Sequence, residues 1–198
     1  MFQLPLLYSS TVTDWETFAG RDKGESPAER LLLYRAKTPR EWQKVEPSPH
    51  ESIADTKKPI CTFFIREEGG QIELTLHTFP FNTLQERIPC MAQVERWKRQ
   101  FSPLDPLSCV VEPVSQNGFA GLRFEGEGIW RAQPAACIAW TMRLDADYIK
   151  RLPPEQNSLC ADYTIKAVGP PHLMATYRQE ILSFATSFEL IEELPYPK

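Results

Sequence analysis

The chain of 198 residues lacks the features that usually mark a membrane protein or a nucleic-acid-binding protein. No apolar run approaches the roughly 20 residues that a membrane-spanning helix needs. Its 26 acidic and 22 basic residues give a net charge of −4 and form no long run of either sign. A basic stripe, which would attract nucleic acid or an anionic membrane, is therefore missing. We expect no nucleic-acid partner and no membrane insertion.

The first residues lack the features of an export signal. The start, Met-Phe-Gln-Leu-Pro-Leu-Leu-Tyr, has no Lys or Arg, its apolar run is short and broken by Pro5, and no cleavage site follows. We therefore expect a cytoplasmic protein, with export as the alternative if a leader precedes these residues.

Cysteines are few and lie far apart. Their number is odd, and no two of them form a C-x-x-C pair. A free Cys in an apolar run usually behaves as a small buried hydrophobe. We expect reduced thiols at Cys61, Cys90, Cys109, Cys137 and Cys160.

The short motifs of catalytic and nucleotide-binding sites are missing too: there is no G-x-S-x-G, P-loop, G-x-G-x-x-G or H-E-x-x-H. The histidines, His50, His77 and His172, are far apart. His50, Glu51 and Asp55 could hold a hard cation, but a solvated loop is favoured because zinc ligands usually lie closer in sequence. A Cys and His nucleophile pair stays open, since such pairs meet in space. We expect no catalytic residue, cofactor or metal.

What the chain does have is enough apolar sequence for a full core. Its hydrophobic content is 42% and its aromatic content 11%, which favours a single folded domain. We place that domain at residues 29–190, after a partly irregular extension at 1–28 and before a tail at 191–198. Within the extension, Thr13 to Glu16 is a candidate start of a short helix.

Short alternating segments predict strands, most of them joined by tight turns. Glu67-Glu-Gly-Gly70 is a clear hairpin signal. After it, Ile72, Leu74 and Leu76 share one face of a strand, whereas Glu73, Thr75 and His77 share the other. The predicted strands are 30–36, 60–66, 71–79, 107–114, 118–125, 135–144 and 161–168.

Two amphipathic helices accompany these strands. From 172 to 188 an apolar stripe recurs at steps of three and four, after Gly169 and Pro170. Its members are Leu173, Tyr177, Ile181, Phe184 and Phe188. A second stripe, Met91, Val94, Trp97 and Phe101, predicts a helix over 89–101. The sequence thus predicts an α+β fold, a mainly antiparallel sheet of about six to seven strands covered by helices in an α/β/α sandwich.

Two features are compatible with binding chemistry but have simpler explanations. The outer face of the helix over 89–101 carries Arg96, Lys98 and Arg99, which we interpret as a solvated basic face because the whole chain is acidic. Four glycines between 118 and 128 resemble a phosphate loop only in number. No helix follows them to supply N–H donors, so hairpin geometry explains them better.

Both ends of the predicted domain resemble a known family. Tyr34-Arg-Ala-Lys-Thr-Pro39-Arg-Glu-Trp42 is similar to the strand, Pro and Trp start of Mog1/PsbP-like domains, which include the bacterial DcrB-like proteins. Ile181-Leu-Ser-Phe-Ala-Thr-Ser187-Phe188 resembles the closing helix of that family. The resemblance implies an antiparallel sheet between helices over about 29–190. Family members bind unrelated partners, among them a small GTPase, a photosystem and secretion-system clients, so the fold does not fix the function.

Aromatic residues and Arg in connecting segments form the candidate partner surface, because these residue types are enriched at binding hot spots. They are Trp42, Phe79, Phe81, Trp130 and Arg131. The alternative is that the rings fill the core.

We therefore expect a non-enzymatic protein-binding, adaptor or chaperone-like domain of bacterial type. The alternatives are an enzyme with a site built from dispersed polar loop residues, and a small-molecule carrier. A concave, polar-lined cavity would favour either alternative.

Overall fold

The computed structural model describes residues 11–20, 32–47, 56–81, 83–151 and 161–191. Within these ranges the chain forms two antiparallel sheets, and the larger one has seven strands in the order β3-β4-β5-β9-β8-β7-β6. In that order the strands are Gln43–Val45, Cys61–Glu67, Gly70–Pro80, Ala161–Gly169, Gln133–Leu144, Phe119–Trp130 and Val110–Gln116. The smaller sheet has the order β1-β2-β10, with strands Thr13–Ala19, Leu32–Pro39 and Glu189–Leu190.

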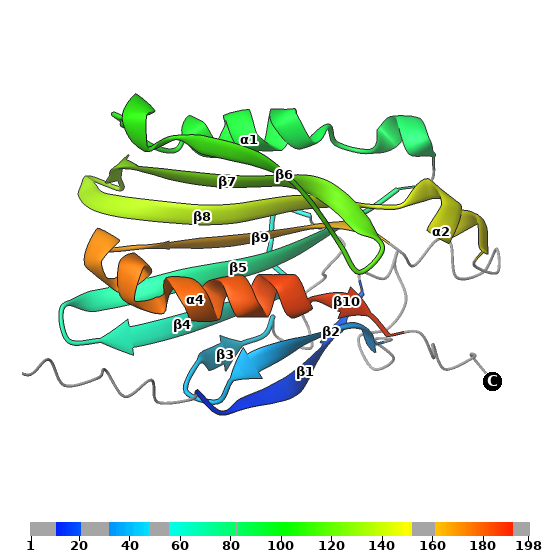
Figure 1. The fold of residues 1–198 in the computed structure, drawn as a ribbon, viewed down its shortest axis with the longest axis horizontal. Coiled ribbons are helices and arrows are strands. Elements are labelled where there is room, and N and C mark those ends of the chain that lie inside the picture. The colour runs from blue at the N-terminus through cyan, green and yellow to red at the C-terminus, as the bar shows by residue number, and fades with distance from the viewer. Residues whose placement is uncertain (1–10, 21–31, 48–55, 82, 152–160, 192–198) are drawn as a thin grey trace, which may run out of the picture.

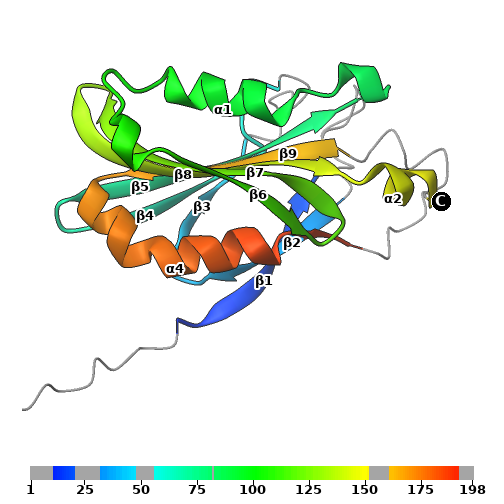
Figure 2. The ribbon, with the colours of Figure 1, turned by 45° about the horizontal axis from the view of Figure 1, so that its top comes forward.

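Helices cover both faces of the larger sheet (Figure 1). Helix α1 (Cys90–Lys98) packs on one face, whereas α4 (Pro171–Ser187) and the smaller sheet cover the other. Figure 2 shows the same layers after a turn about the horizontal axis. A short helix, α2 (Ala146–Arg151), follows β8, and two 3₁₀ turns occupy Leu84–Glu86 and Pro106–Ser108. This arrangement confirms the predicted α+β class and the mainly antiparallel sheet.

The start of the domain differs from the sequence prediction. The expected helix at Thr13 to Glu16 is wrong, because these residues begin strand β1, which pairs with β2 from Thr13↔Pro39 to Ala19↔Leu32. Regular structure therefore begins before residue 29. Only Phe18 of this strand is fully buried, so its sequence shows little alternation and its conformation depends on pairing with β2. The short strands β3 and β10 were also not predicted.

Aromatic rings fill the core on the α4 side. Phe184 and Phe188 are 0% exposed, as their place in the apolar stripe predicts. The Phe184 ring lies 5.4 Å from Trp42 and 5.4 Å from Phe63, measured between centroids. Phe188 stacks on Tyr34 at 5.3 Å. Because these rings come from β2, β4, α4 and the segment before β3, one cluster joins the two sheets.

The turn between β6 and β7 completes the hydrogen bonding of α4. The last carbonyl groups of a helix have no partner within the helix. Here Asn117 Nδ2 donates to the carbonyl oxygens of Thr186 and Phe188, both at 3.0 Å, and Gln116 Nε2 donates to that of Ala185 at 2.6 Å. The hairpin tip therefore fixes the end of α4 against the edge of the larger sheet.

Among the glycines between 118 and 128, Gly118 serves the hairpin turn, as the sequence predicts. Gly118 has a positive φ of 79° in the turn that Asn117 begins, and the other three lie within β7. At Gly128 an added Cβ would collide with the carbonyl oxygen of Pro103, so only Gly fits there.

The opposite turn, between β7 and β8, is strained. Its two central residues, Arg131 and Ala132, have φ values of 49° and 64°. Hairpin turns with two positive φ values favour Asn-Gly, because other residues lose free energy in that region. The turn keeps two unfavourable residues, and Arg131 is one of the candidate binding residues.

Truncation of Phe184 tests the role of the aromatic cluster. Phe184→Ala should lower the free energy of unfolding by about 3–5 kcal/mol, since it removes a fully buried ring. Urea denaturation measures the change. Ser183→Ala, on the exposed side of the same helix, should change the free energy of unfolding by less than about 0.5 kcal/mol. A small effect of Phe184→Ala would mean that α4 does not depend on this cluster.

Relief of the strained turn should stabilise the protein. Ala132→Gly should raise the free energy of unfolding by roughly 1 kcal/mol, because Gly adopts positive φ without a steric penalty. Ala120→Gly, at an exposed position inside β7, should have the opposite effect and lower the free energy of unfolding by about 0.5–1 kcal/mol. Thermal melts of the two variants give the comparison, and two losses of similar size would show that the turn is not strained.

Candidate functional site

The two faces of the larger sheet are covered to different extents. Helix α1 contacts β7 and β8, where Val94 and Trp97 pack against Phe124 and Ala139. On β4 and β5, alternate residues belong to the α4-side core: Phe63 on β4, and Ile72, Leu74 and Leu76 on β5. Their neighbours therefore point to the α1 side, beyond the strands that α1 contacts.

We call this second surface the open face. The strand register places its residues on one side of the sheet: Phe64 lies opposite Glu73, Thr75 opposite Lys166, and His77 opposite Thr164. Its accessible residues include Phe64, Arg66, Glu73, His77, Phe79 and Lys166. The predicted partition of β5, with Glu73, Thr75 and His77 on one face, is confirmed.

At one end of the open face, cations surround a tryptophan ring. The half-buried Trp130 lies beneath Arg131, whose guanidinium carbon is 4.1 Å from the ring centroid. The Lys166 ammonium is 6.0 Å from the same ring and donates to Gln100 Oε1 at 3.0 Å. Arg131 also reaches Glu73, at 3.8 Å between Nη1 and Oε2. We call these four residues, Trp130, Arg131, Lys166 and Glu73, the Trp130 cluster.

Lys166 is an unfavourable residue at its position. Burial lowers the pKa of its ammonium group, and nearby Arg96 and Arg131 lower it further, whereas Cys137 and Glu73 act in the opposite direction. A lowered pKa in the folded state means that the unfolded chain binds the Lys166 proton more tightly. Stability therefore rises as the pH increases from the folded pKa towards the ordinary value of 10.5, and at neutral pH the charged Lys166 destabilises the fold.

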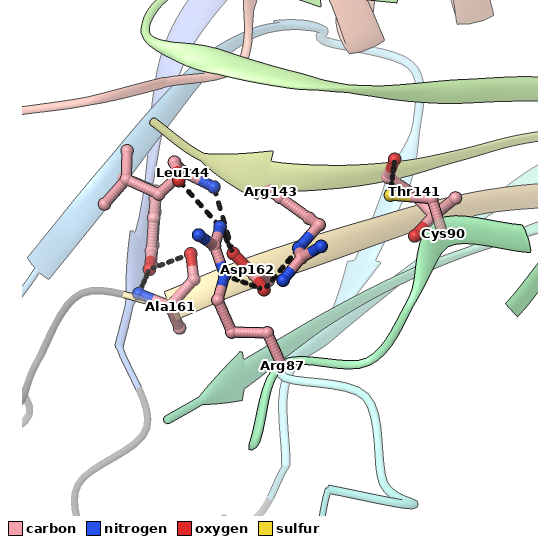
Figure 3. A network of polar contacts seen from close by, with 8 residues as sticks. Arg87, Cys90, Thr141, Arg143, Leu144, Ala161 and Asp162 are labelled. Atoms are coloured by element: carbon pink, nitrogen blue, oxygen red, sulfur yellow. Dashed lines mark hydrogen bonds and ion pairs between the residues drawn. The ribbon is translucent and has the colours of Figure 1, made fainter. Parts of the chain in front are cut away.

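At the other end, a buried ion pair joins the segment before α1 to β9 (Figure 3). The side chains of Arg87 and Asp162 are 6% and 9% exposed. Arg87 Nε and Nη2 donate to the two carboxylate oxygens of Asp162 at 2.9 and 2.5 Å. The carbonyl oxygen of Leu144 accepts from Arg87 at 2.6 Å, and the backbone N–H of Leu144 donates to Asp162 at 2.9 Å. Both charges are thus hydrogen-bonded as burial requires.

Arg143 lies beside this pair without a hydrogen bond to it. Its Nε is 3.9 Å from Asp162 Oδ2, too far for a hydrogen bond, and has no other hydrogen-bond partner in the described structure. It lines a small pocket with Phe79, Gln93, Thr141 and Thr164. This pocket is concave and polar-lined, but its volume of about 10 Å³ holds one water molecule, so it does not favour an enzyme or a small-molecule carrier.

The predicted partner residues divide into two groups. Trp42 is 5% exposed and packs on Phe63 and Phe184, and Phe81 is 8% exposed with Arg87 over its ring. For these two the alternative of core filling holds, so they cannot form an exposed surface. Turn position misled the sequence argument, because a ring in a short turn can still point inward. The other three, Phe79, Trp130 and Arg131, are accessible, and all lie on the α1 side of the larger sheet.

Sequence reasoning missed an exposed aromatic residue on the smaller sheet. Trp15 is 49% exposed, with Arg35 at 4.8 Å and Lys37 at 5.4 Å from its ring. The strand that presents it was not predicted, so its exposure could not be inferred. Arg35 is paired with Glu189 at 2.6 Å, which reduces the charge available to a partner there.

The thiols of this structure are free where they are described. Cys61 and Cys137 are buried, and burial raises the pKa of each thiol to about 12, which makes both poor nucleophiles. Cys90 and Cys109 are free and partly exposed. Cys160 lies outside the described residues.

The other sequence features have simple outcomes within the described ranges. No group of three His, Cys, Asp or Glu residues there is arranged to hold a metal, and His50, Glu51 and Asp55 lie outside these ranges. No helix in the described part is long and apolar enough to cross a membrane. Along α1, Met91 is exposed, in contrast to the predicted stripe.

The basic face of α1 is largely solvated, as predicted. Arg96 and Arg99 are exposed, and Lys98 forms an ion pair with Glu95 at 2.8 Å.

Comparisons with known proteins identify the fold. No family model and no curated protein sequence matches this chain. The structure of LpqN, involved in cell envelope biogenesis of Mycobacterium tuberculosis, is similar with a TM-score of 0.50 at 9% identity, over 90% of this chain and 91% of that chain. Cyanobacterial PsbP (CyanoP) from Synechocystis sp. PCC 6803 is similar with a TM-score of 0.50 at 10% identity, over 95% and 99%. The PsbP-like architecture that the sequence resemblance implied is thus confirmed. Such low identity carries no function with it.

The buried ion pair gives a stability prediction. Asp162→Asn should lower the free energy of unfolding by about 3–5 kcal/mol, because it leaves the buried Arg87 charge without its partner. Arg143→Gln should cost less than about 1 kcal/mol, since that partly exposed side chain makes no hydrogen bond to Asp162. Chemical denaturation of both variants gives the ranking, and equal losses would contradict the different roles assigned to the two arginines.

Proposed function

We propose that this chain is a non-enzymatic binding domain that docks an acidic segment of another protein on the open face. The observation that supports this most strongly is the excess of positive charge around Trp130 on an acidic protein. Arg96 and Arg131 both lie close enough to Lys166 to lower its pKa, and Glu73 opposes this effect and lies 3.8 Å from Arg131. The whole chain carries −4. Such a local reversal of sign attracts negatively charged partners.

The residue types of the open face also suit protein binding. Phe64, Phe79 and Trp130 are half-buried rings on strands, where a rigid backbone holds them. Aromatic rings and arginines provide most hot-spot residues at protein interfaces. A ring that is already ordered loses little conformational entropy when a partner covers it.

The unfavourable features of the Trp130 cluster support a binding role. Lys166 destabilises the fold at neutral pH, and Arg131 lies in a strained turn. Proteins retain such residues mainly where function requires them, because replacements that increase stability are easy to find. Both residues project their charges next to the same tryptophan ring.

The pocket beside Arg143 bears on the second candidate, small-molecule binding. Its cavity volume is about 10 Å³, which is enough for one water molecule. Ligand pockets usually have about 300–1,000 Å³. The pocket is therefore too small for a ligand, and protein docking is the better account of the face as a whole.

LpqN shares the fold of this chain at 9% identity. LpqN is involved in cell envelope biogenesis. We propose an accessory binding role for this chain, and its cytoplasmic or exported location stays a prediction.

Binding to peptides of graded charge tests the proposal. Fluorescence anisotropy with labelled 12-residue peptides should show that acidic peptides bind, whereas neutral and basic ones do not, with affinity falling as salt is added. Trp130→Ala should weaken binding of an acidic peptide by about 30-fold, or about 2 kcal/mol. Trp15→Ala, which removes an exposed ring on the other side, should leave it unchanged.

A second variant separates binding from folding. Lys166→Met should weaken acidic-peptide binding while its melting temperature stays equal to or above that of the wild type, because a destabilising charge is lost. Normal binding by both variants, or a loss confined to Trp15→Ala, would show that the partner uses another surface.

A further inference from the structure

A cavity of about 530 Å³ lies where the ends of β7 and β8 meet residues 103–106 and the first residue of α4 (Figure 2). Ligand pockets usually have about 300–1,000 Å³, so its size suits a small molecule. A second cavity of about 170 Å³ adjoins it, and the two share Glu127 and Pro171. Much of the wall of the larger cavity is made of prolines, namely Pro103, Pro106, Pro134 and Pro171.

Two acidic residues face each other at the larger cavity. Leu104 pairs with Gly128 in an antiparallel bridge, so the next residue, Asp105, lies directly opposite Glu127. The N–H of Asp105 donates to the carbonyl oxygen of Glu127 at 2.8 Å, and both residues line the cavity. Residues that are directly opposite share one face, with Cβ atoms about 5 Å apart, and like charges in such a pair are destabilising. One cation between them would contact both carboxylates.

Neither carboxylate has a cationic partner in the part of the chain that the structure describes. The Glu127 side chain has no hydrogen bond or ion pair there, and Asp105 Oδ1 accepts from the N–H of Leu107 at 2.9 Å. The Ser108 hydroxyl completes the backbone contacts, because it donates to the carbonyl oxygen of Asp105 at 2.8 Å and accepts from the N–H of Glu127 at 2.7 Å. The backbone therefore fixes the two acids while leaving both charges uncompensated.

The smaller cavity adds no further free charge. Its Glu125 lies 2.8 Å from Arg178 and 3.2 Å from Arg123, so its carboxylate is already paired. The charged residues that line the two cavities are three acids and one arginine, a net charge of −2. Within the described ranges no group of three His, Cys, Asp or Glu residues is arranged to hold a metal, which favours an organic cation over a metal ion.

We propose that the larger cavity binds a small organic cation, a primary ammonium group on an apolar chain. The ammonium lies between Asp105 and Glu127 and donates to both carboxylates, since it has three N–H donors. The chain lies against the proline wall, which is rigid because the proline ring fixes the backbone.

The inference goes beyond docking on the open face. The described lining of the two cavities contains no residue of the Trp130 cluster. The ligand also has the opposite charge to the acidic segment proposed there.

An NMR titration of the full chain with hexylammonium chloride at pH 7 tests the proposal, with ionic strength held constant by sodium chloride. Saturable shifts are expected at the amides of Asp105, Glu127 and Ile129. Methylammonium keeps the charge without the chain, and 1-hexanol keeps the chain without the charge, so each should bind at least about tenfold more weakly. Shifts that do not saturate, or equal binding of either analogue, would overturn the proposal.

Single substitutions locate the site. Glu127→Gln should weaken hexylammonium binding at least fivefold, while its melting temperature stays at or above that of the wild type because one of two facing like charges is lost. Glu95→Gln, which removes the same charge from an exposed glutamate paired with Lys98 on α1, should leave binding unchanged. Normal binding by Glu127→Gln, or an equal loss in both variants, would contradict the site.

The blocked tripeptide acetyl-Gly-Lys-Gly-amide carries the same ammonium group on a polypeptide. Hexylammonium should bind at least as tightly as this peptide, and tighter binding of the peptide would overturn the small-molecule assignment in favour of a lysine of a docked protein. Trp130→Ala should leave hexylammonium binding unchanged, so a failure of this site is measured separately from a failure of docking on the open face.

Discussion

The packing of α4 between the two sheets is the contact on which this fold depends. Its aromatic residues meet rings from β1, β2 and β4, so one cluster joins segments that are far apart in the chain. The hairpin tip at Asn117 then binds the last carbonyl groups of the helix. On this side α4 and the smaller sheet bury the apolar residues of β4 and β5, whereas on the other side the same two strands retain accessible polar and aromatic residues.

The size of α1 explains why the other side is only partly covered. A helix with its side chains is about 10–12 Å across, and strands lie about 4.8 Å apart, so one helix covers roughly two to three strands. The larger sheet has seven. Helix α1 packs on β7 and β8, and the α1-side residues of β4 and β5 are accordingly polar, aromatic or charged. Both the Trp130 cluster and the Arg143 pocket lie on this side, next to the helix, because that is where the cover ends.

The sequence predicts the elements with strong periodicity and misses those that depend on pairing. The stripe of α4 and the alternation of β5 follow from residue spacing alone. Strand β1 has little alternation, and β3 and β10 are three and two residues long, so only their partners reveal them. The sequence does not separate accessible from buried aromatic residues either. Trp42 and Trp130 both lie next to turns, but Trp42 is buried in the fold whereas Trp130 is half-buried. The polar pocket joins β8, β9 and α1, whose closeness no local pattern shows.

Mapping the binding of an acidic peptide by NMR is the sharpest experiment on docking at the open face. Amide and side-chain shifts should concentrate on β4, β5, β9 and the end of β7, around Phe79, Trp130 and Lys166. Shifts concentrated on β1 and β2 around Trp15, or spread evenly over the surface, would contradict it.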